Sequence, residues 1–171
     1  MVIKNFWSLQ VDEAIVAEKI KALKEVEAFF PVNSQLKDID LIVFNLKTHR
    51  IKTVQVKSSK SWKSGGDEYS GQRIPINKIN PKLVDFFIFS CYFSTLTKNQ
   101  RKITPRYVVI PTKELLDRIK KTKVVKNGIC KFYFNVYKGK IADFGQLKNG
   151  IDDDKGVDYT KYRDNFKLLK T

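Results

Sequence analysis

The chain has 171 residues, 42% of them apolar, and 33 Lys and Arg against 18 Asp and Glu give it a net charge of +15. This length fits a single domain with one hydrophobic core, and the apolar content excludes a disordered chain. The charge favours a polyanionic partner, with nucleic acid as the first candidate, although a lysine-rich surface that only maintains solubility has the same composition.

The two cysteines, Cys91 and Cys130, are too few for a disulfide framework or a structural zinc site, and we expect both to be core thiols. The longest apolar run, residues 86–93, is far too short to cross a bilayer. The N-terminus has no uninterrupted apolar segment before a cleavage site. We therefore expect a soluble protein of the reducing cytoplasm, with no membrane partner.

The first predicted element is a helix over residues 12–30, with Asp12 as its N-cap. Its apolar stripe consists of Ile15, Ala22, Leu23, Val26 and Phe30. Glu18 lies near the margin of this stripe rather than on the opposite polar face. It is either an edge residue whose carboxylate reaches solvent or a carboxylate directed at something beneath the helix.

A β-hairpin is predicted from two segments rich in β-forming residues, 38–45 and 50–58. The polar residues between them suit a short turn. If Asn45 pairs with Arg50 across this turn, the constant sum of residue numbers in an antiparallel pair places Asp40 opposite Gln55.

The side-chain period of two places Lys57 on the same face of the hairpin as Asp40 and Gln55. Asp38 lies on this face too, nearer the strand end, and is an alternative acid that either assists or caps the turn. The opposite face carries apolar residues, namely Leu41, Val43, Val54 and Val56.

Residues 58–80 are polar and contain glycines without a sustained period, which predicts a long loop. Buried strands are predicted over residues 83–93 and 106–110, followed by a helix over residues 112–121. A further strand is predicted over residues 131–137, and the apolar residues of the tail suggest a short docking helix. This order of elements implies an α/β fold in which helices flank a mixed β-sheet.

The helix with Glu18, the segment KDIDLIVFN entering one strand and the segment KTVQVKSSK leaving the next resemble the core of the PD-(D/E)XK nuclease superfamily. This superfamily includes restriction-endonuclease-like and Holliday-junction-resolvase-like members, with the element order αβββαβ. The matching residues are Asp40, which opens the second strand, and the triplet Gln55, Val56 and Lys57, which takes the place of the acid-any-Lys triplet. The resemblance implies one domain over residues 1–171, with a core of about 10–125 and a C-terminal extension of 126–171.

The resemblance also implies a site for Mg²⁺ or Mn²⁺, which prefer oxygen ligands. Asp40 would supply the anionic ligand, the amide oxygen of Gln55 and the main-chain carbonyl of Val56 would complete one side, and Glu18 would bind through water or hold a second ion. Lys57 would orient and help deprotonate the attacking water or stabilise the pentavalent phosphate. The family usually has Glu or Asp where this chain has Gln55, and the neutral amide removes one negative charge from the site.

Most of the positive charge lies in residues 61–171, with a net charge of +12, against +3 for residues 1–60. Candidates for contact with a sugar-phosphate backbone are Lys60, Trp62, Lys63, Arg73, Lys98, Arg101 and Lys102. Trp62 would stack on a base or, alternatively, cover the sheet edge. The basic stretch over residues 98–126 has its own alternative, a solvated face.

These features predict a Mg²⁺- or Mn²⁺-dependent DNA endonuclease of the restriction, resolvase or mobile-element kind. Its partner would be double-stranded DNA, and cutting both strands would favour a homodimer, because one such site cuts one strand. One alternative is a nucleic-acid-binding module of the same fold that has lost catalysis, motivated by Gln55. Another is an RNA-directed nuclease or RNA-binding protein, because the sequence does not separate DNA from RNA.

Overall fold

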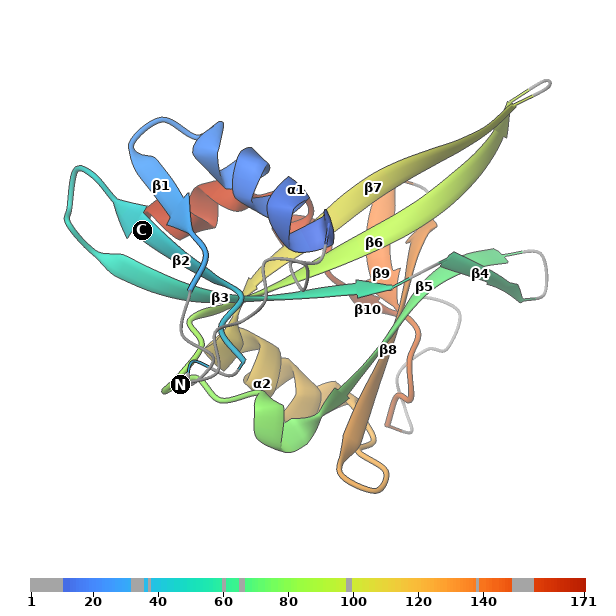
Figure 1. The fold of residues 1–171 in the computed structure, drawn as a ribbon. Coiled ribbons are helices and arrows are strands. Elements are labelled where there is room, and N and C mark those ends of the chain that lie inside the picture. Colours follow the sequence, from blue (N-terminus) through green and yellow to red (C-terminus); the bar gives the residue numbers. More distant parts are fainter. Residues whose placement is uncertain are drawn as a thin grey trace.

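The computed structural model describes residues 11–31, 36, 38–59, 61–64, 67–97, 100–137, 139–148 and 156–171, with the backbone alone for 61–64, 67–68, 94–97, 100–102 and 137. This part of the chain forms two α-helices, α1 (Val11–Lys21) and α2 (Thr112–Thr122), and two curled β-sheets (Figure 1). The fold is therefore a mixed α/β arrangement.

The first sheet has the strand order β1-β2-β3-β6-β7. Its strands are β1 (Val26–Phe29), β2 (Leu41–Asn45), β3 (Ile51–Ser59), β6 (Phe86–Thr97) and β7 (Gln100–Pro111). Neighbouring strands are antiparallel except β3 and β6, which are parallel. A parallel pair needs a long crossover connection, and here that connection runs through the second sheet.

The second sheet is antiparallel, with the strand order β10-β9-β8-β5-β4. Its strands are β4 (Ser61–Ser64), β5 (Asp67–Pro75), β8 (Ile129–Tyr137), β9 (Lys140–Asp143) and β10 (Val157–Asp158). The crossover from β3 to β6 supplies β4, β5 and the 3-10 turn η2 (Ile76–Lys78). Only residue 60 separates β3 from β4, so one stretch of chain passes directly from the first sheet into the second.

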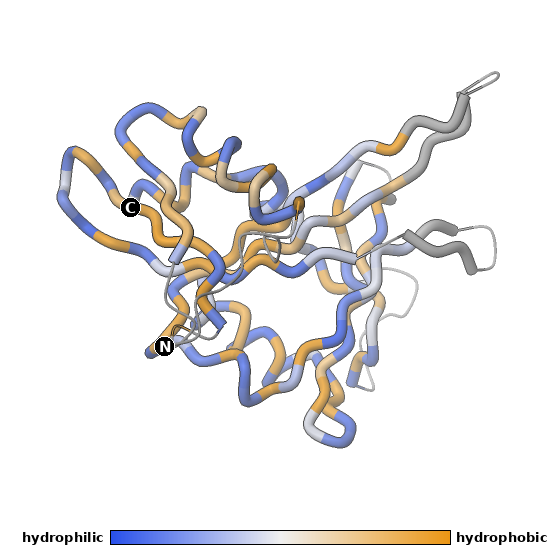
Figure 2. The backbone as a smooth tube through the Cα atoms, viewed as in Figure 1, coloured by the Kyte–Doolittle hydropathy of each residue, from blue (hydrophilic) through white to orange (hydrophobic). Residues whose placement is uncertain are grey.

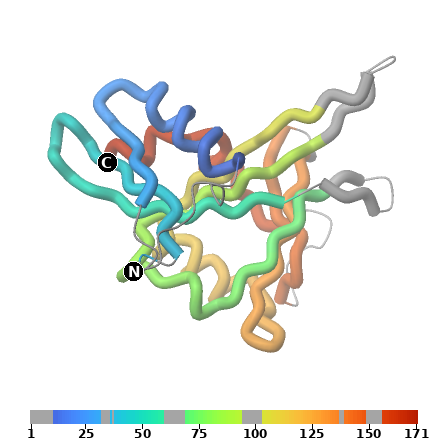
Figure 3. Tube along the Cα trace, in the orientation of Figure 1, coloured from blue at the N-terminus to red at the C-terminus, as the bar shows by residue number. Residues whose placement is uncertain are grey.

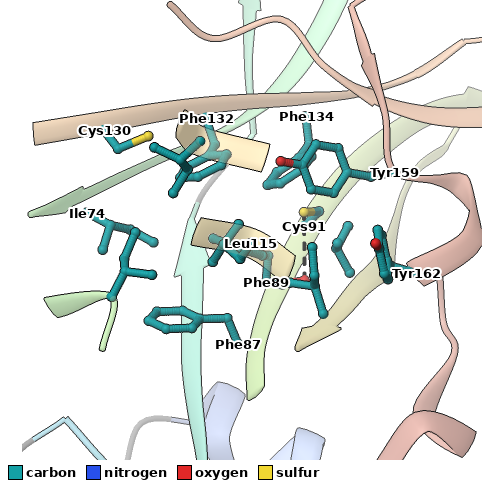
Figure 4. Close-up of a cluster of buried hydrophobic side chains, with 14 of the residues drawn as sticks. Ile74, Phe87, Phe89, Cys91, Leu115, Cys130, Phe132, Phe134, Tyr159 and Tyr162 are labelled. Carbon is teal, nitrogen blue, oxygen red and sulfur yellow. Dashed lines mark hydrogen bonds between the residues drawn. The ribbon is translucent and has the colours of Figure 1, made fainter. Parts of the chain in front are cut away.

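The two sheets share a hydrophobic core, which we call the inter-sheet core (Figure 4). It contains Phe87, Phe89 and Cys91 of β6, Phe132 and Phe134 of β8, Ile74 of β5 and Leu115 of α2. The ring centre of Phe89 lies 5.2 Å from that of Phe132 and 5.1 Å from that of Phe134. These tilted aromatic contacts join the two sheets near their centres.

The other face of the first sheet carries a second cluster, which we call the helix-side core. It joins α1 (Val16, Ala17, Ile20) to the sheet (Leu41, Val43, Val54, Val56, Ile88, Val109) and to the C-terminal segment (Phe166, Leu169). Figure 3 shows this C-terminal segment in red beside the blue N-terminal elements. Asn45 Nδ2 also donates a hydrogen bond of 2.8 Å to the carbonyl of Lys170, which fastens the chain end to the β2–β3 turn.

The strand pattern explains why the first sheet can serve two cores. In β2 the residues Leu41, Val43 and Asn45 are buried, whereas Ile42 and Phe44 are half-buried, as alternation in a strand requires. Hydrophobic residues concentrate along the strands where the layers meet, and the outer turns are hydrophilic (Figure 2). The mixed sheet therefore lies between a helix on one side and a second sheet on the other.

The helix predicted over residues 12–30 is too long. The α-helix ends at Lys21, the chain turns at Glu25 with a φ of 77°, and Val26–Phe29 form strand β1. A positive φ at a non-glycine residue is incompatible with a continuing helix. The apolar residues beyond Lys21 therefore continue the helical spacing by coincidence, and the predicted stripe is wrong.

The long loop predicted over residues 58–80 is also wrong, because β4, β5 and η2 occupy most of it. The predicted hairpin, the first buried strand, the helix after residue 111 and the strand over 131–137 are confirmed to within a few residues, and the second buried strand is confirmed but begins six residues earlier than predicted, at Gln100. The tail docks as predicted, through the 3-10 helices η3 (Thr160–Tyr162) and η4 (Phe166–Lys170).

The order expected from the family resemblance holds for α1, β1, β2 and β3 but changes after them. The connection from β3 to its parallel neighbour β6 contains a β-hairpin and a 3-10 turn instead of an α-helix, and α2 follows only after β7. Residues after 126 supply β8 and β9, and Phe132 and Phe134 belong to the inter-sheet core.

Both cysteines are buried core thiols, as predicted. Burial raises the pKa of Cys91 to about 12 and that of Cys130 to about 11, so both thiols stay protonated at neutral pH. Neither is suited to nucleophilic chemistry. Of the helices in the described ranges, none has the length and apolar character that crossing a membrane requires.

A fully buried ion pair joins Lys123, just after α2, to Asp143 at the end of β9. The other carboxylate oxygen of Asp143 accepts hydrogen bonds from the main-chain N–H groups of Tyr133 and Gly145, each at 2.8 Å. We predict that Lys123→Met lowers the free energy of unfolding by about 3–5 kcal/mol, because it leaves a buried carboxylate without its counterion. Urea unfolding measures this loss. The exposed Lys126→Met is the control, and equal stability of the two variants would contradict the prediction.

Candidate active site

The register of the β2–β3 hairpin is the one predicted from the sequence. Leu41 pairs with Val54 and Phe44 with Ile51, and the N–H of Asn45 donates to the carbonyl of Arg50 at 2.9 Å. The hairpin thus brings the segment around Asp40 to the middle of β3.

Successive side chains of β3 alternate between the two faces of the first sheet. Val54 and Val56 are directed into the helix-side core. Gln55 and Lys57 pair with Phe87 and Phe89 of the parallel strand β6, whose side chains belong to the inter-sheet core. Partners in neighbouring strands share a face, so Gln55 and Lys57 lie on the inter-sheet side.

Asp40 immediately precedes β2 and contacts the main chain of β3. Its N–H donates to the carbonyl of Val54 at 2.9 Å, and its carboxylate accepts a hydrogen bond of 2.7 Å from the N–H of Val56. Because β2 begins at Leu41, which pairs with Val54, it does not reach far enough to pair with Val56. The N–H and carbonyl of a strand residue point to the same edge, so the Val56 carbonyl faces the side on which the Asp40 carboxylate lies.

Gln55 is only 2% exposed, and its side-chain oxygen Oε1 is buried with no hydrogen-bond donor among the described residues. A buried acceptor without a partner is costly, and such groups are uncommon in folded proteins. Gln55 directly precedes Val56, whose N–H donates the hydrogen bond to the Asp40 carboxylate. The proposed site therefore combines a carboxylate that precedes β2 with an unsatisfied amide oxygen on β3.

Lys57 is half-buried, and its main chain is tied to the second sheet. The Nε2 of Gln72 on β5 donates a long hydrogen bond of 3.4 Å to the Lys57 carbonyl, and the hydroxyls of Ser59 and Ser70 lie 2.9 Å apart. Gln72 is buried. The position of Gln72 could not be inferred from sequence, because residues 58–80 are predicted to form a loop.

Glu18 does not join this group. Its side chain is 76% exposed and lies 3.7 Å from Lys21 in a surface ion pair. The buried face of α1 is instead formed by Glu13, Val16, Ala17 and Ile20. The acid on the buried face of α1 is therefore Glu13, which is 5% exposed. Its helical spacing from Val16, Ala17 and Ile20 is the sequence pattern that could have indicated this.

Glu13 is on the helix-side of the first sheet, whereas Gln55 and Lys57 are on the inter-sheet side. Asp38, the alternative acid, has a φ of 74° and forms an ion pair of 2.8 Å with Lys78. Asp38 thus serves the turn before β2. Asp40 is the acid that the described contacts place against β3.

The residues predicted to contact nucleic acid are spread over several strands. Lys60 and Lys98 lie outside the described residues. Trp62 and Lys63 belong to β4, opposite Tyr69 and Glu68 of β5, and Arg101 and Lys102 belong to β7, opposite Leu96 and Thr95 of β6. Arg73 on β5 is exposed. The described members of this set therefore lie on β4 and β5 of the second sheet and on β7 of the first.

The donor set suits a hard divalent cation. Asp40 has a carboxylate, Gln55 has an amide oxygen that lacks a donor, and Val56 has a main-chain carbonyl at the same strand edge. All three are oxygen donors of the kind that Mg²⁺ and Mn²⁺ take. Within the described ranges, no three His, Cys, Asp or Glu side chains gather as a metal site, so a cation here would depend on mixed oxygen donors.

No family model matches the chain, and no curated protein matches it in sequence. A bacterial homing endonuclease, I-Ssp6803I, has a structure similar to this one, with a TM-score of 0.44 and 10% sequence identity. The match covers 98% of this chain and 93% of that chain. A likeness at this distance does not show the family, and the function has to be inferred from the site.

We predict that Asp40→Asn weakens Mn²⁺ binding by at least about tenfold, because it removes the carboxylate charge at nearly constant shape. Asparagine keeps an oxygen that can accept the Val56 hydrogen bond. Titration calorimetry of the metal-free protein with Mn²⁺ measures this directly, without nucleic acid. Glu18→Gln is the matched control, since it removes one carboxylate from the exposed face of α1, and equal weakening by both variants would contradict a site at Asp40.

We predict the opposite effect for Gln55→Glu, which adds a negative charge beside Asp40. The variant should be less stable than the wild type without metal, because a buried carboxylate near Asp40 is unfavourable. It should regain stability as Mn²⁺ is added, since a ligand that binds the folded state stabilises it. Thermal unfolding with and without Mn²⁺ measures both effects, and a stability that does not respond to Mn²⁺ would exclude residue 55 as a cation ligand.

Proposed function

We propose that this protein is a divalent-cation-dependent endonuclease that hydrolyses phosphodiester bonds in DNA, of the PD-(D/E)XK kind. One observation carries the proposal: the Asp40 carboxylate accepts a hydrogen bond of 2.7 Å from the N–H of Val56, and Val56 lies between Lys57 and Gln55, whose side-chain oxygen is buried without a donor among the described residues. The proposed site would therefore combine an anionic donor, a neutral oxygen donor and an ammonium group at one short stretch of β3.

Asp40, Gln55 and the Val56 carbonyl would hold the cation. When bound, Mg²⁺ or Mn²⁺ supplies Lewis-acid stabilisation of charge on the phosphate and lowers the pKa of a water ligand. Glu18 is left out of this assignment, because it is exposed and paired with Lys21.

Lys57 would act on the substrate through its ammonium group. Its position on the inter-sheet face with Gln55 lets it orient the attacking water or donate hydrogen bonds to the phosphate oxygens. Asp40 is already held by the Val56 N–H, so its carboxylate is oriented before substrate arrives.

DNA as the substrate is supported by the charge. The net charge is +15, and residues 61–171 carry +12 of it. Such a surplus strengthens binding to a phosphate backbone through counterion release. Cleavage of both strands of a duplex would require two sites, and hence two copies of the chain.

A second candidate function is a DNA-binding module of the same fold without catalysis. The neutral side chain of Gln55 favours this alternative, because among the described residues it leaves Asp40 as the one carboxylate assigned to the site. Under this alternative, DNA binding depends steeply on salt and no divalent cation supports cleavage. An RNA substrate is a third candidate, and competition between DNA and RNA separates it from the first.

We predict that the wild-type protein cuts plasmid DNA with Mg²⁺ or Mn²⁺ and that Asp40→Asn and Lys57→Met each slow cutting by about a hundredfold or more. Gel electrophoresis of plasmid incubated with each protein measures the rates. Lys52→Met is the matched control, because Lys52 is also half-buried on β3 but alternates with Gln55 and Lys57 onto the opposite face.

Equal cutting by the wild type and both site variants would reject the proposed site. Salt-dependent binding of DNA without cutting under either cation would reject catalysis and support the binding module.

A further inference from the structure

The β6–β7 hairpin is longer than the sheet to which it belongs. Strand β3 pairs with β6 only as far as Ser59 and Cys91. Beyond that point six residue pairs, from Tyr92 and Pro105 to Thr97 and Gln100, join β6 to β7 alone. At about 3.4 Å per residue this two-stranded ribbon extends about 20 Å past the sheet. Figure 1 shows it projecting away from the body of the molecule.

The base of the ribbon is fixed by side-chain contacts on both of its faces. Phe93 packs against the inter-sheet core, and the Tyr92 hydroxyl donates to the carboxylate of Asp12 on α1. On β7, Arg106 forms an ion pair of 3.6 Å with Asp164, whose carboxylate also accepts the N–H of Tyr107 at 2.9 Å. The ribbon therefore leaves the body in a defined direction.

Its composition is basic. Residues 92–97 and 100–105 include Arg101 and Lys102 and contain no Asp or Glu. Ile103 is 63% exposed, an apolar side chain on the projecting part. Charged residues on a free strand edge also prevent edge-to-edge association, and that is the simplest explanation for them. Edge protection, however, needs neither charges of one sign nor an exposed isoleucine.

We infer that the β6–β7 ribbon binds double-stranded DNA by entering its major groove, an inference that rests on the proposed function and names its substrate. The major groove of B-form DNA is about 12 Å wide and admits a two-stranded β-ribbon. Basic residues on the ribbon contact the flanking phosphates, and an exposed apolar side chain meets the thymine methyl groups of that groove. The major groove of A-form RNA is deep and narrow, so the ribbon selects DNA over duplex RNA.

The test measures binding of the full chain to a short fluorescent DNA duplex in EDTA, where no cutting occurs. The variant Arg101→Thr/Lys102→Thr removes two charges and keeps β-forming residues. We expect it to weaken binding by at least about tenfold and to reduce the slope of log affinity against log salt by about two. Lys120→Ala/Lys121→Ala removes two charges from exposed positions of α2 and should change affinity by less than about threefold.

Equal weakening by the two double variants would overturn the inference, as would the absence of DNA binding by the wild type. Equal competition by duplex RNA would overturn the major-groove assignment. A change in the sedimentation of the ribbon variant without a change in DNA affinity would show that the charges only protect the strand edges. Because no cation is present, failure of cleavage leaves the result for the ribbon unaffected, and the two proposals can fail separately.

Discussion

The hydrogen bond between the Asp40 carboxylate and the Val56 N–H depends on the unequal lengths of two neighbouring strands. β2 has five residues and β3 has nine, so β3 continues past the end of its partner. An exposed strand edge presents N–H and carbonyl groups in turn, and a carboxylate satisfies only the donors. Asp40 therefore stabilises the Val56 N–H by a charge-assisted bond and leaves carbonyl oxygen at the same edge. Because β2 begins only at Leu41, the Asp40 carboxylate takes the place of a main-chain acceptor for the Val56 N–H.

The rest of the structure holds β3 in place at this point. Val54 and Val56 are buried on one face in the helix-side core, and on the other face Gln55 and Lys57 lie beside Phe87 and Phe89. The unpaired oxygen of Gln55 costs about 1–3 kcal/mol, which the surrounding cores offset.

The hairpin could be predicted from sequence because its information is local. Alternation in β2 and β3 and the polar turn between them determine the register, and the register places Asp40 near Gln55. Glu18 lies on the exposed face of α1, and the sequence alone did not indicate this because the apolar residues of β1 continue the helical spacing and displace the inferred apolar stripe. Gln72 was missed because β5 is polar and pairs with β8, more than 50 residues away, so neither its period nor its neighbours indicated a strand.

The charges at the site connect cation binding with nucleic acid. Asp40 contributes one negative charge, Gln55 contributes none, and Lys57 and a net charge of +15 act against a second cation. A magnesium ion in proteins is commonly held by one or two carboxylates together with substrate phosphates. In the proposed function, phosphate oxygens from DNA would supply the negative charge that Gln55 lacks. Cation and DNA would then each strengthen the binding of the other, because a coupling between two ligands is reciprocal. A neutral residue at position 55 would in that case make cation binding tighter in the DNA complex than in the free protein.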